Sequence, residues 1–282
     1  MTRPDDPTVV RTAYWIAAAR ARESLRPDRL FNDPYAAALA GYRGPAIMAA
    51  SERVTGSPNP YLPVRTRYFD DAVLDAVAAG AEQVVLLGAG MDTRAFRLAL
   101  PADLDWYEVD HDSLFAAKEP VLDAARAVPA CRRRIVPGDV TADLVTVLAG
   151  TGFSPRRPTA WVAEGLLYYL TPEQVDALLR TLAGRSAPGS RLLADLVGTA
   201  RIDEMHETRL RHGVKDLPRP FGHDDPAALL AASGWGIHTL TRAGALDANF
   251  GRFAGRPPVQ PGTPEHAQRL RSQAYLIVAT RP

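Results

Sequence analysis

Glycines and carboxylates follow several short apolar runs of this 282-residue chain, in a spacing that suits the binding of a nucleoside. The run 84–87 leads directly into Gly88, Ala89 and Gly90. Glycine lacks a Cβ, so a ligand can approach the backbone here, and the helix predicted to follow offers unpaired N–H groups. The third glycine of the dinucleotide fingerprint would fall at Thr93, so the pyrophosphate-binding form of that motif is incomplete.

Asp110 stands twenty residues after Gly90, at the end of the next apolar run. A carboxylate at this strand end can accept hydrogen bonds from both ribose hydroxyls of an adenosine group. The alternative is that Asp110 caps the helix predicted to begin near Ser113. Its place at the switch-point crevice of a parallel sheet favours ligand binding. Glu108 stands two residues earlier on the same strand and points to the same face. We therefore expect Glu108 only to support Asp110, without contacting the ligand itself.

Two later strand ends also carry acidic residues. Asp139, with the N–H of Val140, could hydrogen-bond the amine and a ring nitrogen of adenine. Asp139 would serve equally well as a turn residue that caps the helix at Thr141. Glu164 and Gly165 follow the fourth run, and a carboxylate between apolar runs should face a polar cleft with a cationic or donor partner.

Several other chemistries lack their key groups. The only lysines are Lys118 and Lys215; neither belongs to a phosphate loop or follows a tyrosine by four positions. A Gly-x-Ser-x-Gly elbow is missing. Asp110 and His111 are adjacent on a strand and point to opposite faces, which argues against a metal site. Cys131 is the only cysteine, which excludes an internal disulfide.

Composition limits the partners. The chain has 33 Lys and Arg against 32 Asp and Glu, a formal charge of +1, and 46% hydrophobic residues. A balanced charge gives no electrostatic footprint for nucleic acid or a membrane surface, and no apolar run is long enough for a membrane span. The polar start, Met1 to Pro7, does not resemble a secretory signal. We therefore expect a cytoplasmic protein with a small-molecule partner.

The elements that must position these residues form an alternating β-α series, typical of an α/β, doubly wound, mainly parallel sheet. The expected strands are 84–87, 104–109, 134–136, 159–163 and 191–196, and the helices between them are 93–100, 113–127, 143–148 and 172–183. Two final strands, 235–241 and 274–280, could pair as an antiparallel hairpin despite a long connection between them.

Four regions are predicted from these patterns. Residues 1–80 form an N-terminal helical lid, with helices at 8–26, 35–39 and 63–80 and a loop at 41–63 that is rich in glycine and proline. Residues 81–198 form the α/β core. Residues 199–225 are a cap insertion that begins with a charged helix, and residues 226–282 complete the core.

The same motifs resemble the leucine carboxyl methyltransferase family of S-adenosylmethionine enzymes over about residues 12–197. The resemblance rests on Leu87–Thr93, Tyr107–Asp110, Gly138–Val140, Ala163–Glu164 with Tyr169–Gln174, and the N-terminal Asn32–Tyr35 and Arg65–Arg67. It implies a seven-stranded class I methyltransferase sheet with N-terminal helices and an inserted cap. On the substrate side, the chain is more similar to bacterial members that act on polyketides and other small metabolites.

The resemblance also implies roles for individual residues. It assigns Arg65 to the methionine carboxylate, Gly88, Ala89 and Gly90 to the methionine-adenosine turn, Asp110 with His111 to the ribose, Asp139 and Val140 to adenine, and Glu164 with Gly165 to the methionine amino group. A cationic residue of the family falls on Arg22, or on Arg20 if the intervening loop differs in length. Leu86 replaces an acidic residue of the general methyltransferase pattern, as is usual in this family.

The expected reaction is O-methylation of a carboxylate on a small metabolite, with S-adenosylhomocysteine as the other product. An ionised carboxylate is already a nucleophile, whereas a phenol, with a pKa near 10, requires a general base. His206, His212 and His223 are candidate bases, and Tyr14, Tyr168 and Tyr169 could form aromatic walls for the acceptor. The alternatives are a phenol or a protein C-terminus as acceptor, a nicotinamide-dependent oxidoreductase, and a binding module without catalysis.

Overall fold

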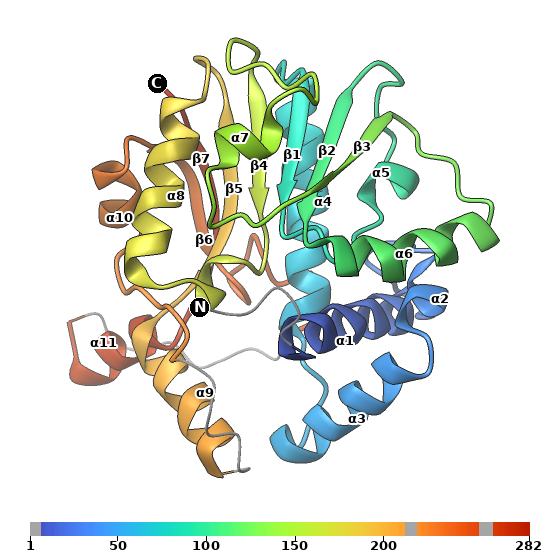
Figure 1. The fold of residues 1–282 in the computed structure, drawn as a ribbon. Coiled ribbons are helices and arrows are strands. Elements are labelled where there is room, and N and C mark those ends of the chain that lie inside the picture. Colours follow the sequence, from blue (N-terminus) through green and yellow to red (C-terminus); the bar gives the residue numbers. More distant parts are fainter. Residues whose placement is uncertain (1–6, 212–218, 254–261) are drawn as a thin grey trace. The chain divides into compact units, whose positions relative to one another are not determined.

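The structure is a computed structural model that describes residues 7–211, 219–253 and 262–282. It divides into two compact units, of which the first ends at Ser154 and the second begins at Pro155. Among the described residues the strand order is β3-β2-β1-β4-β5-β7-β6, with the first three strands in the first unit and the last four in the second (Figure 1). The seven-stranded α/β sheet expected from the sequence is confirmed.

The first unit is built on three parallel strands, β1 (Gln83–Leu87), β2 (Asp105–Asp110) and β3 (Arg132–Pro137). Every residue of β1 and β2 is buried, which explains why the sequence is continuously apolar at 84–87. The helices α5 (Arg94–Arg97), α6 (Asp112–Ala124) and α7 (Leu144–Leu148) follow these strands in turn. The short apolar runs therefore located the bounds of these strands to within two residues.

The helices before β1 are α1 (Pro7–Ser24), α2 (Ala36–Ala40), α3 (Arg43–Thr55) and α4 (Tyr61–Ala78). The predicted loop at 41–63 is wrong, because α3 occupies most of it. Pro45 lies in the first turn of α3, where proline is tolerated. A Cβ on Gly44 would lie 2.5 Å from the Tyr14 carbonyl oxygen and 3.0 Å from the Ala18 Cβ. Gly44 therefore allows α3 to pack closely on α1 and does not break the helix.

The second unit contains the parallel pair β4 (Thr159–Ala163) and β5 (Arg191–Val197), followed by β7 (Ala274–Thr280) and β6 (Gly236–Arg242). The predicted antiparallel pairing of the last two strands is confirmed, and β7 also pairs antiparallel with β5. The remaining elements are η1 (Leu167–Tyr169), α8 (Pro172–Gly184), α9 (Thr199–Arg211), α10 (Pro226–Ala232) and α11 (Pro264–Arg271).

Two of these elements bear on the predicted cap and connection. Helix α9 matches the charged helix expected over the start of the cap, whereas residues 212–218 of that predicted cap lie outside the described residues. Helix α11 was not predicted within the long connection to the last strand. Across the described parts of the chain, no helix is both long and apolar enough to cross a lipid bilayer.

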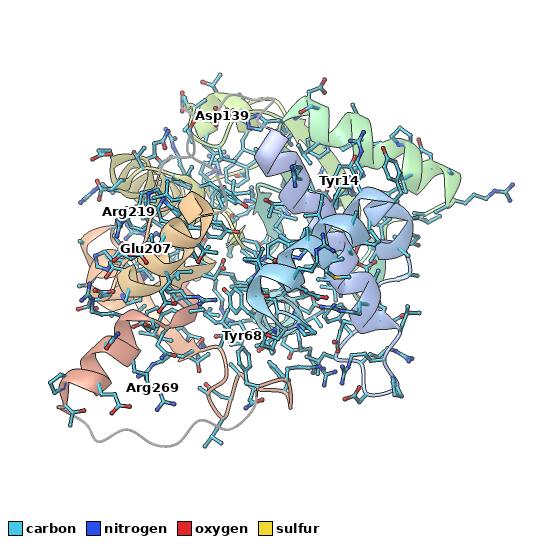
Figure 2. The ribbon with its side chains drawn as sticks, turned by 90° about the horizontal axis from the view of Figure 1, so that it is seen from below. Tyr14, Tyr68, Asp139, Glu207, Arg219 and Arg269 are labelled. Carbon is cyan, nitrogen blue, oxygen red and sulfur yellow. The ribbon has the colours of Figure 1, made fainter. Side chains whose placement is uncertain are left out.

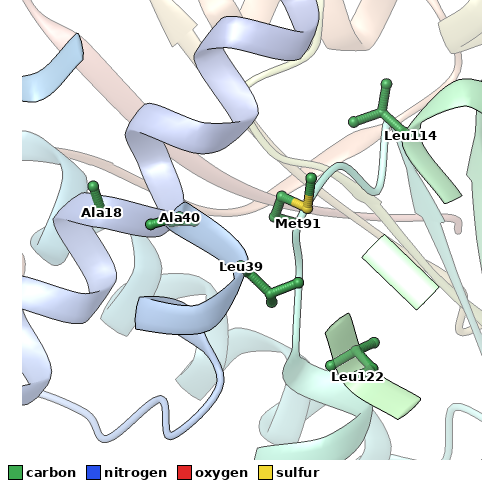
Figure 3. Close-up of a cluster of buried hydrophobic side chains, with 7 residues drawn as sticks. Ala18, Leu39, Ala40, Met91, Leu114 and Leu122 are labelled. Carbon is green, nitrogen blue, oxygen red and sulfur yellow. The ribbon is translucent and has the colours of Figure 1, made fainter. Parts of the chain in front are cut away.

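One apolar cluster joins the N-terminal helices to the turn after β1. Met91, in that turn, is 2% exposed and packs with Leu114 and Leu122 of α6. The cluster also contains Ala17 and Ala18 of α1 and Leu39 and Ala40 of α2 (Figure 3). Burial of a methionine side chain contributes about 1.5–3 kcal/mol. Helices α1 and α2 are thus packed at the carboxyl end of β1, as Figure 1 also shows.

Candidate functional site

The turn after β1 has the backbone conformation that its glycines make possible. Gly88 and Gly90 both have positive φ, +67° and +47°, a region that side chains with a Cβ rarely enter. The N–H groups of Gly88 and Ala89 donate to the Val109 carbonyl at 2.9 and 3.1 Å. A Cβ on Gly90 would lie 3.6 Å from the Cβ of Ala13 in α1. The turn is therefore bonded to β2 on one side and lies against α1 on the other.

Asp110 ends β2 and is 6% exposed. Its Oδ2 accepts the N–H of Gly90 at 2.6 Å, and its Oδ1 accepts the N–H of His111 at 2.7 Å. Burial raises the pKa of Asp110 above the ordinary aspartate value, and these two N–H donors offset only part of that effect. Each carboxylate oxygen has a second lone pair, so Asp110 can still accept hydrogen bonds from a ligand.

The predicted alternative was that Asp110 caps the helix that begins near Ser113, but its carboxylate bonds to the N–H groups of Gly90 and His111. The residue that precedes α6 is His111, and its side chain makes no capping hydrogen bond to the helix. Glu108 is fully buried and bonds to Lys118 at 2.7 Å and to Arg133 at 2.7 Å. Burial acts to raise the pKa of Glu108, but Lys118 and Arg133 outweigh it and hold that pKa below its usual value. Glu108 is thus an ion-paired residue between β2, α6 and β3.

The two N-terminal arginines considered for a cofactor contact have different partners. Arg20 of α1 donates from Nε to Asp33 at 2.8 Å and from a second guanidinium nitrogen to the Met91 carbonyl. Arg22 is more exposed and pairs with Glu52 of α3. Of the two arginines, Arg20 is therefore the one that bonds to the turn after β1.

Arg65 projects from α4 and is buried. It is 3% exposed, and its guanidinium carbon lies 5.5 Å from the centroid of the Tyr61 ring. A buried arginine needs hydrogen-bonding or ionic partners, and a ligand carboxylate is one kind of partner that suits its fork of N–H donors.

Asp139 and Val140 lie in the turn after β3. The Oδ1 of Asp139 accepts the N–H of Thr141 at 2.8 Å and its hydroxyl at 2.7 Å, which is the turn role that the sequence left open. The preceding N–H, of Gly138, donates to the Asp110 carbonyl at 2.9 Å. This bond places the Asp139 turn beside the end of β2. Tyr14, on α1, has a half-buried side chain. Both Asp139 and Tyr14 are labelled in Figure 2.

In the second unit, Glu164 and Gly165 follow β4. Gly165 has a φ of +65°, and its N–H donates at 2.5 Å to Oδ1 of Asp195, a buried residue of β5. Glu164 is half-buried. Asp195 did not stand out in the sequence, although a carboxylate within an apolar strand is the same signal that identified Glu164. The parallel pair therefore holds the turn after β4 through a buried carboxylate.

Tyr168 and Tyr169 form a paired aromatic surface in η1. Their ring centroids are 4.4 Å apart, and the Tyr168 hydroxyl donates to that of Tyr169 at 3.4 Å. The Tyr168 carbonyl accepts the N–H of Phe221 at 3.1 Å. Phe221 was not predicted as a site residue because it follows a stretch of chain without a readable motif. This bond brings the end of the predicted cap to the turn after β4.

His223 lies beside the carboxyl end of β5. Its N–H donates to the Val197 carbonyl at 2.9 Å, and its ring stacks on Phe221 with centroids 6.4 Å apart. Its Nδ1 accepts the N–H of Asp225 at 3.1 Å. His206 is half-buried on α9, and His212 lies outside the described residues. Among the described residues, no group of three His, Cys, Asp or Glu side chains is arranged to hold a metal ion.

Each unit presents its candidate residues at the carboxyl ends of its parallel strands. The first unit brings together the Gly88–Gly90 turn, Asp110 and the Asp139 turn, with Arg20 bonded behind the first of these. The second brings together Gly165, Tyr168 and His223 around β4 and β5. The carboxyl ends of parallel strands are where open α/β sheets bind their ligands.

Comparison with known proteins identifies related sequences and folds. The family model for leucine carboxyl methyltransferase matches residues 13–183. A protein from Parafrankia is 46% identical over 207 residues, which cover 71% of this chain and 66% of the relative. A protein from Saccharopolyspora erythraea is 36% identical over 282 residues, which cover 96% and 94% of the two chains. Both carry the name "Putative S-adenosyl-L-methionine-dependent methyltransferase".

Two solved structures share the fold. A DUF574 family protein from Streptomyces avermitilis superposes with a TM-score of 0.64 at 17% identity, covering 91% of this chain and 97% of that one. A methyltransferase-like protein from Thermobifida fusca gives a TM-score of 0.59 at 16% identity, covering 90% and 94%. At these identities the likeness concerns the fold alone.

Proposed function

The chain belongs to the leucine carboxyl methyltransferase family and is an S-adenosylmethionine-dependent methyltransferase, and we propose that it methylates a carboxylate oxygen of a small metabolite. The observation that supports the cofactor site most strongly is the bond between Asp110 and Gly90, because it joins the acidic strand end to the glycine turn. Both features belong to the adenosine-binding edge of such sheets.

The residues present fit this cofactor. Gly88 and Gly90 carry no side chain and have the positive φ angles that favour glycine, and Asp110 offers carboxylate lone pairs suited to ribose hydroxyls. When bound, S-adenosylmethionine supplies a methyl group already activated on its sulfonium. The proposed further contacts are Arg65 to the methionine carboxylate, Ala89 and His111 beside the turn and the ribose, Asp139 and Val140 to adenine, and Glu164 and Gly165 to the amino group.

The hydrogen bond at His223 supports an acceptor that arrives already ionised. A backbone N–H can only donate, so the Nδ1 that accepts the N–H of Asp225 carries no proton. In the neutral ring the proton is then on Nε2, which makes Nε2 a donor. A nitrogen that already carries a proton cannot remove one from a phenol, but it can donate to a carboxylate oxygen.

The chain's own residues then have two tasks, to orient the acceptor and to exclude water. Tyr168 and Tyr169, whose rings are tilted by 39° to each other, would supply an aromatic surface that carries hydroxyl groups, and Tyr14 is a further aromatic candidate. His223 would donate to the acceptor oxygen. No proton has to be removed when the acceptor is an ionised carboxylate, so this arrangement needs no general base.

A matched pair of acceptors tests the proposal. Methyl transfer from S-adenosylmethionine is measured with 2-naphthoic acid and with 2-naphthol, which differ in the oxygen group on one ring system, followed by a wider panel of aromatic acids, phenols and peptides. We expect kcat/KM for acids to exceed that for the matched phenols by about tenfold or more. Preferential methylation of phenols would contradict the carboxylate assignment and would support a phenol O-methyltransferase.

A further inference from the structure

We propose that Asp33 is a positioning residue that holds the Gly88–Thr93 turn in its ligand-binding conformation from outside the sheet. Together with Arg20 and Thr93 it forms what we term the Asp33 clamp. The inference rests on the proposed role of this turn in binding S-adenosylmethionine. It assigns a function to a segment that precedes the sheet and that contacts the turn without belonging to it.

The carboxylate of Asp33 is the centre of the clamp. Its side chain is fully buried, and Oδ2 accepts both the Arg20 Nε, at 2.8 Å, and the Thr93 hydroxyl, at 2.7 Å. Its own N–H donates at 2.8 Å to the hydroxyl of Ser24, which in turn donates to the Arg20 carbonyl at 2.8 Å. The carboxylate is therefore fixed to the last turn of α1 through both its side chain and its backbone.

The Asp33 clamp holds the turn at two residues, Met91 and Thr93. Arg20 donates to the carbonyl of Met91, and Asp33 accepts the hydroxyl of Thr93. Thr93 is the residue that precedes α5, a position where threonine usually accepts an N–H of its own helix. Here it makes no such bond, and the N–H of Arg94 donates to Asp92 at 2.7 Å. The Thr93 hydroxyl thus donates to Asp33 in place of its usual capping role.

Other bonds hold the rest of the turn in the same frame. Asp110 fixes the N–H of Gly90 from β2, and the side chain of Met91 packs in the apolar cluster with α1, α2 and α6. Met91 is therefore held by its carbonyl and by its side chain. The positive φ angles at Gly88 and Gly90 lie within a turn whose two ends are both bonded to fixed groups.

The charges around the clamp make Asp33 hard to replace. Arg97 lies with its Nε 3.9 Å from Oδ2 of Asp33, and it also bonds to Asp70 of α4 at 2.6 and 2.7 Å. Burial acts to raise the pKa of Asp33, but Arg20 and Arg97 outweigh it and hold that pKa below its usual value. Removal of the carboxylate charge would leave two buried guanidinium groups with less compensation.

A purely structural role would also make Asp33 important, so the test needs a readout other than stability. Asp105 provides a matched control, because it is a buried carboxylate of the same unit that pairs with Arg132 at 2.9 Å and Arg134 at 2.6 Å. It lies at the start of β2, the end of that strand away from the turn. Loss of a buried ion pair should lower the melting temperature at either place. Only loss of the Asp33 clamp should weaken binding at the turn.

The experiment is calorimetric titration of the full chain with S-adenosylhomocysteine, below the melting temperature of each variant. Thr93→Val removes the donated hydroxyl with little change in shape, and Thr93→Ser restores it. We expect Thr93→Val to weaken binding about tenfold, Thr93→Ser to bind like wild type, and Asp33→Asn to weaken binding by at least as much as Thr93→Val. Asp105→Asn should bind within about twofold of wild type while melting at a lower temperature.

The outcomes separate the clamp from the proposed function. Wild-type affinity in Thr93→Val would overturn the clamp, as would equal losses of affinity in Asp105→Asn and Asp33→Asn. If Asp33→Asn does not fold, the two Thr93 variants decide the matter alone. Absence of S-adenosylhomocysteine binding by the wild-type chain would contradict the proposed cofactor site itself and with it the clamp.

Discussion

The carboxylate of Asp110 accepts the backbone N–H of Gly90 at 2.6 Å. The acidic residue at the end of β2 therefore also fixes the glycine turn at the end of β1. The bond fixes the conformation of the glycine turn before a ligand binds to the carboxylate. Binding then loses less conformational entropy at the turn. Two sequence features that appear separate along the chain thus act as one site.

Replacement of Asp110 by asparagine should weaken S-adenosylhomocysteine binding by about tenfold to a hundredfold. The variant loses the proposed charged acceptor for the ribose, and a hydrogen bond to a charged group contributes about 1.5–3 kcal/mol. Calorimetric titration measures the affinity, and circular dichroism checks that the chain is folded. An unchanged dissociation constant in a folded variant would show that Asp110 supports the turn without contacting the ligand.

Binding should also depend on pH through Asp110. Because burial raises its pKa, the folded chain holds this proton more tightly than the unfolded chain does. Its contribution to stability is thus fully present below the ordinary aspartate pKa and is lost as the pH rises through the raised value. The ribose needs the ionised form, so affinity for S-adenosylhomocysteine should fall on acidification at a higher pH than an ordinary aspartate would give. Titrations at successive pH values test this, and a fall of the same size in Asp110→Asn would contradict it.

Strands β1 and β4 were predictable because every one of their residues is buried, which leaves a continuous apolar run that ends at a polar residue or glycine. For β4 the predicted and observed bounds, Thr159 to Ala163, are identical. Helix α3 was missed because Gly44 and Pro45 were interpreted as breaks, whereas one is a packing contact and the other a first-turn residue. Local pattern alone does not distinguish these uses of the two residues.

The site residues at the strand ends were predictable for the same reason, but their partners were not. The Thr93 hydroxyl bonds to Asp33, sixty positions earlier in the chain, and no periodicity links the two. Likewise, the proton position on His223 depends on the fold of the loop that brings the Asp225 N–H to its Nδ1. Such contacts arise from tertiary packing, and local sequence patterns do not predict them.

The packing role of Gly44 leads to a stability prediction. Gly44→Ala would place a Cβ 2.5 Å from the Tyr14 carbonyl and 2.9 Å from the Ala40 Cβ, so α3 must shift away from α1. We expect a loss of about 1–3 kcal/mol in the free energy of unfolding, measured with urea. Gly184→Ala is the control, since a Cβ there meets no atom within 4 Å, and it should be neutral or stabilising. Equal stability of Gly44→Ala and wild type would disprove the packing role.

Variants of His223 distinguish a hydrogen-bond donor from a general base. Glutamine keeps an N–H donor near the position of Nε2, so His223→Gln should retain kcat within about tenfold, whereas His223→Phe should lose about tenfold or more in kcat/KM for the acceptor. A general base contributes about 10²–10⁴ in rate, which glutamine cannot supply. Steady-state kinetics with saturating S-adenosylmethionine decides between the two roles. A collapse of kcat in His223→Gln by that larger factor would identify a base and favour a phenol acceptor.

The chemical bond formed in the product tests the central claim most directly. The wild-type protein is incubated with S-adenosylmethionine carrying a labelled methyl group and with the best acceptor from the panel, and the isolated product is treated with mild alkali. A carboxylate acceptor gives a methyl ester, so the account predicts that the label is released as methanol. Label that stays on the product through this treatment would show an aryl ether or another base-stable bond, and would contradict methylation of a carboxylate.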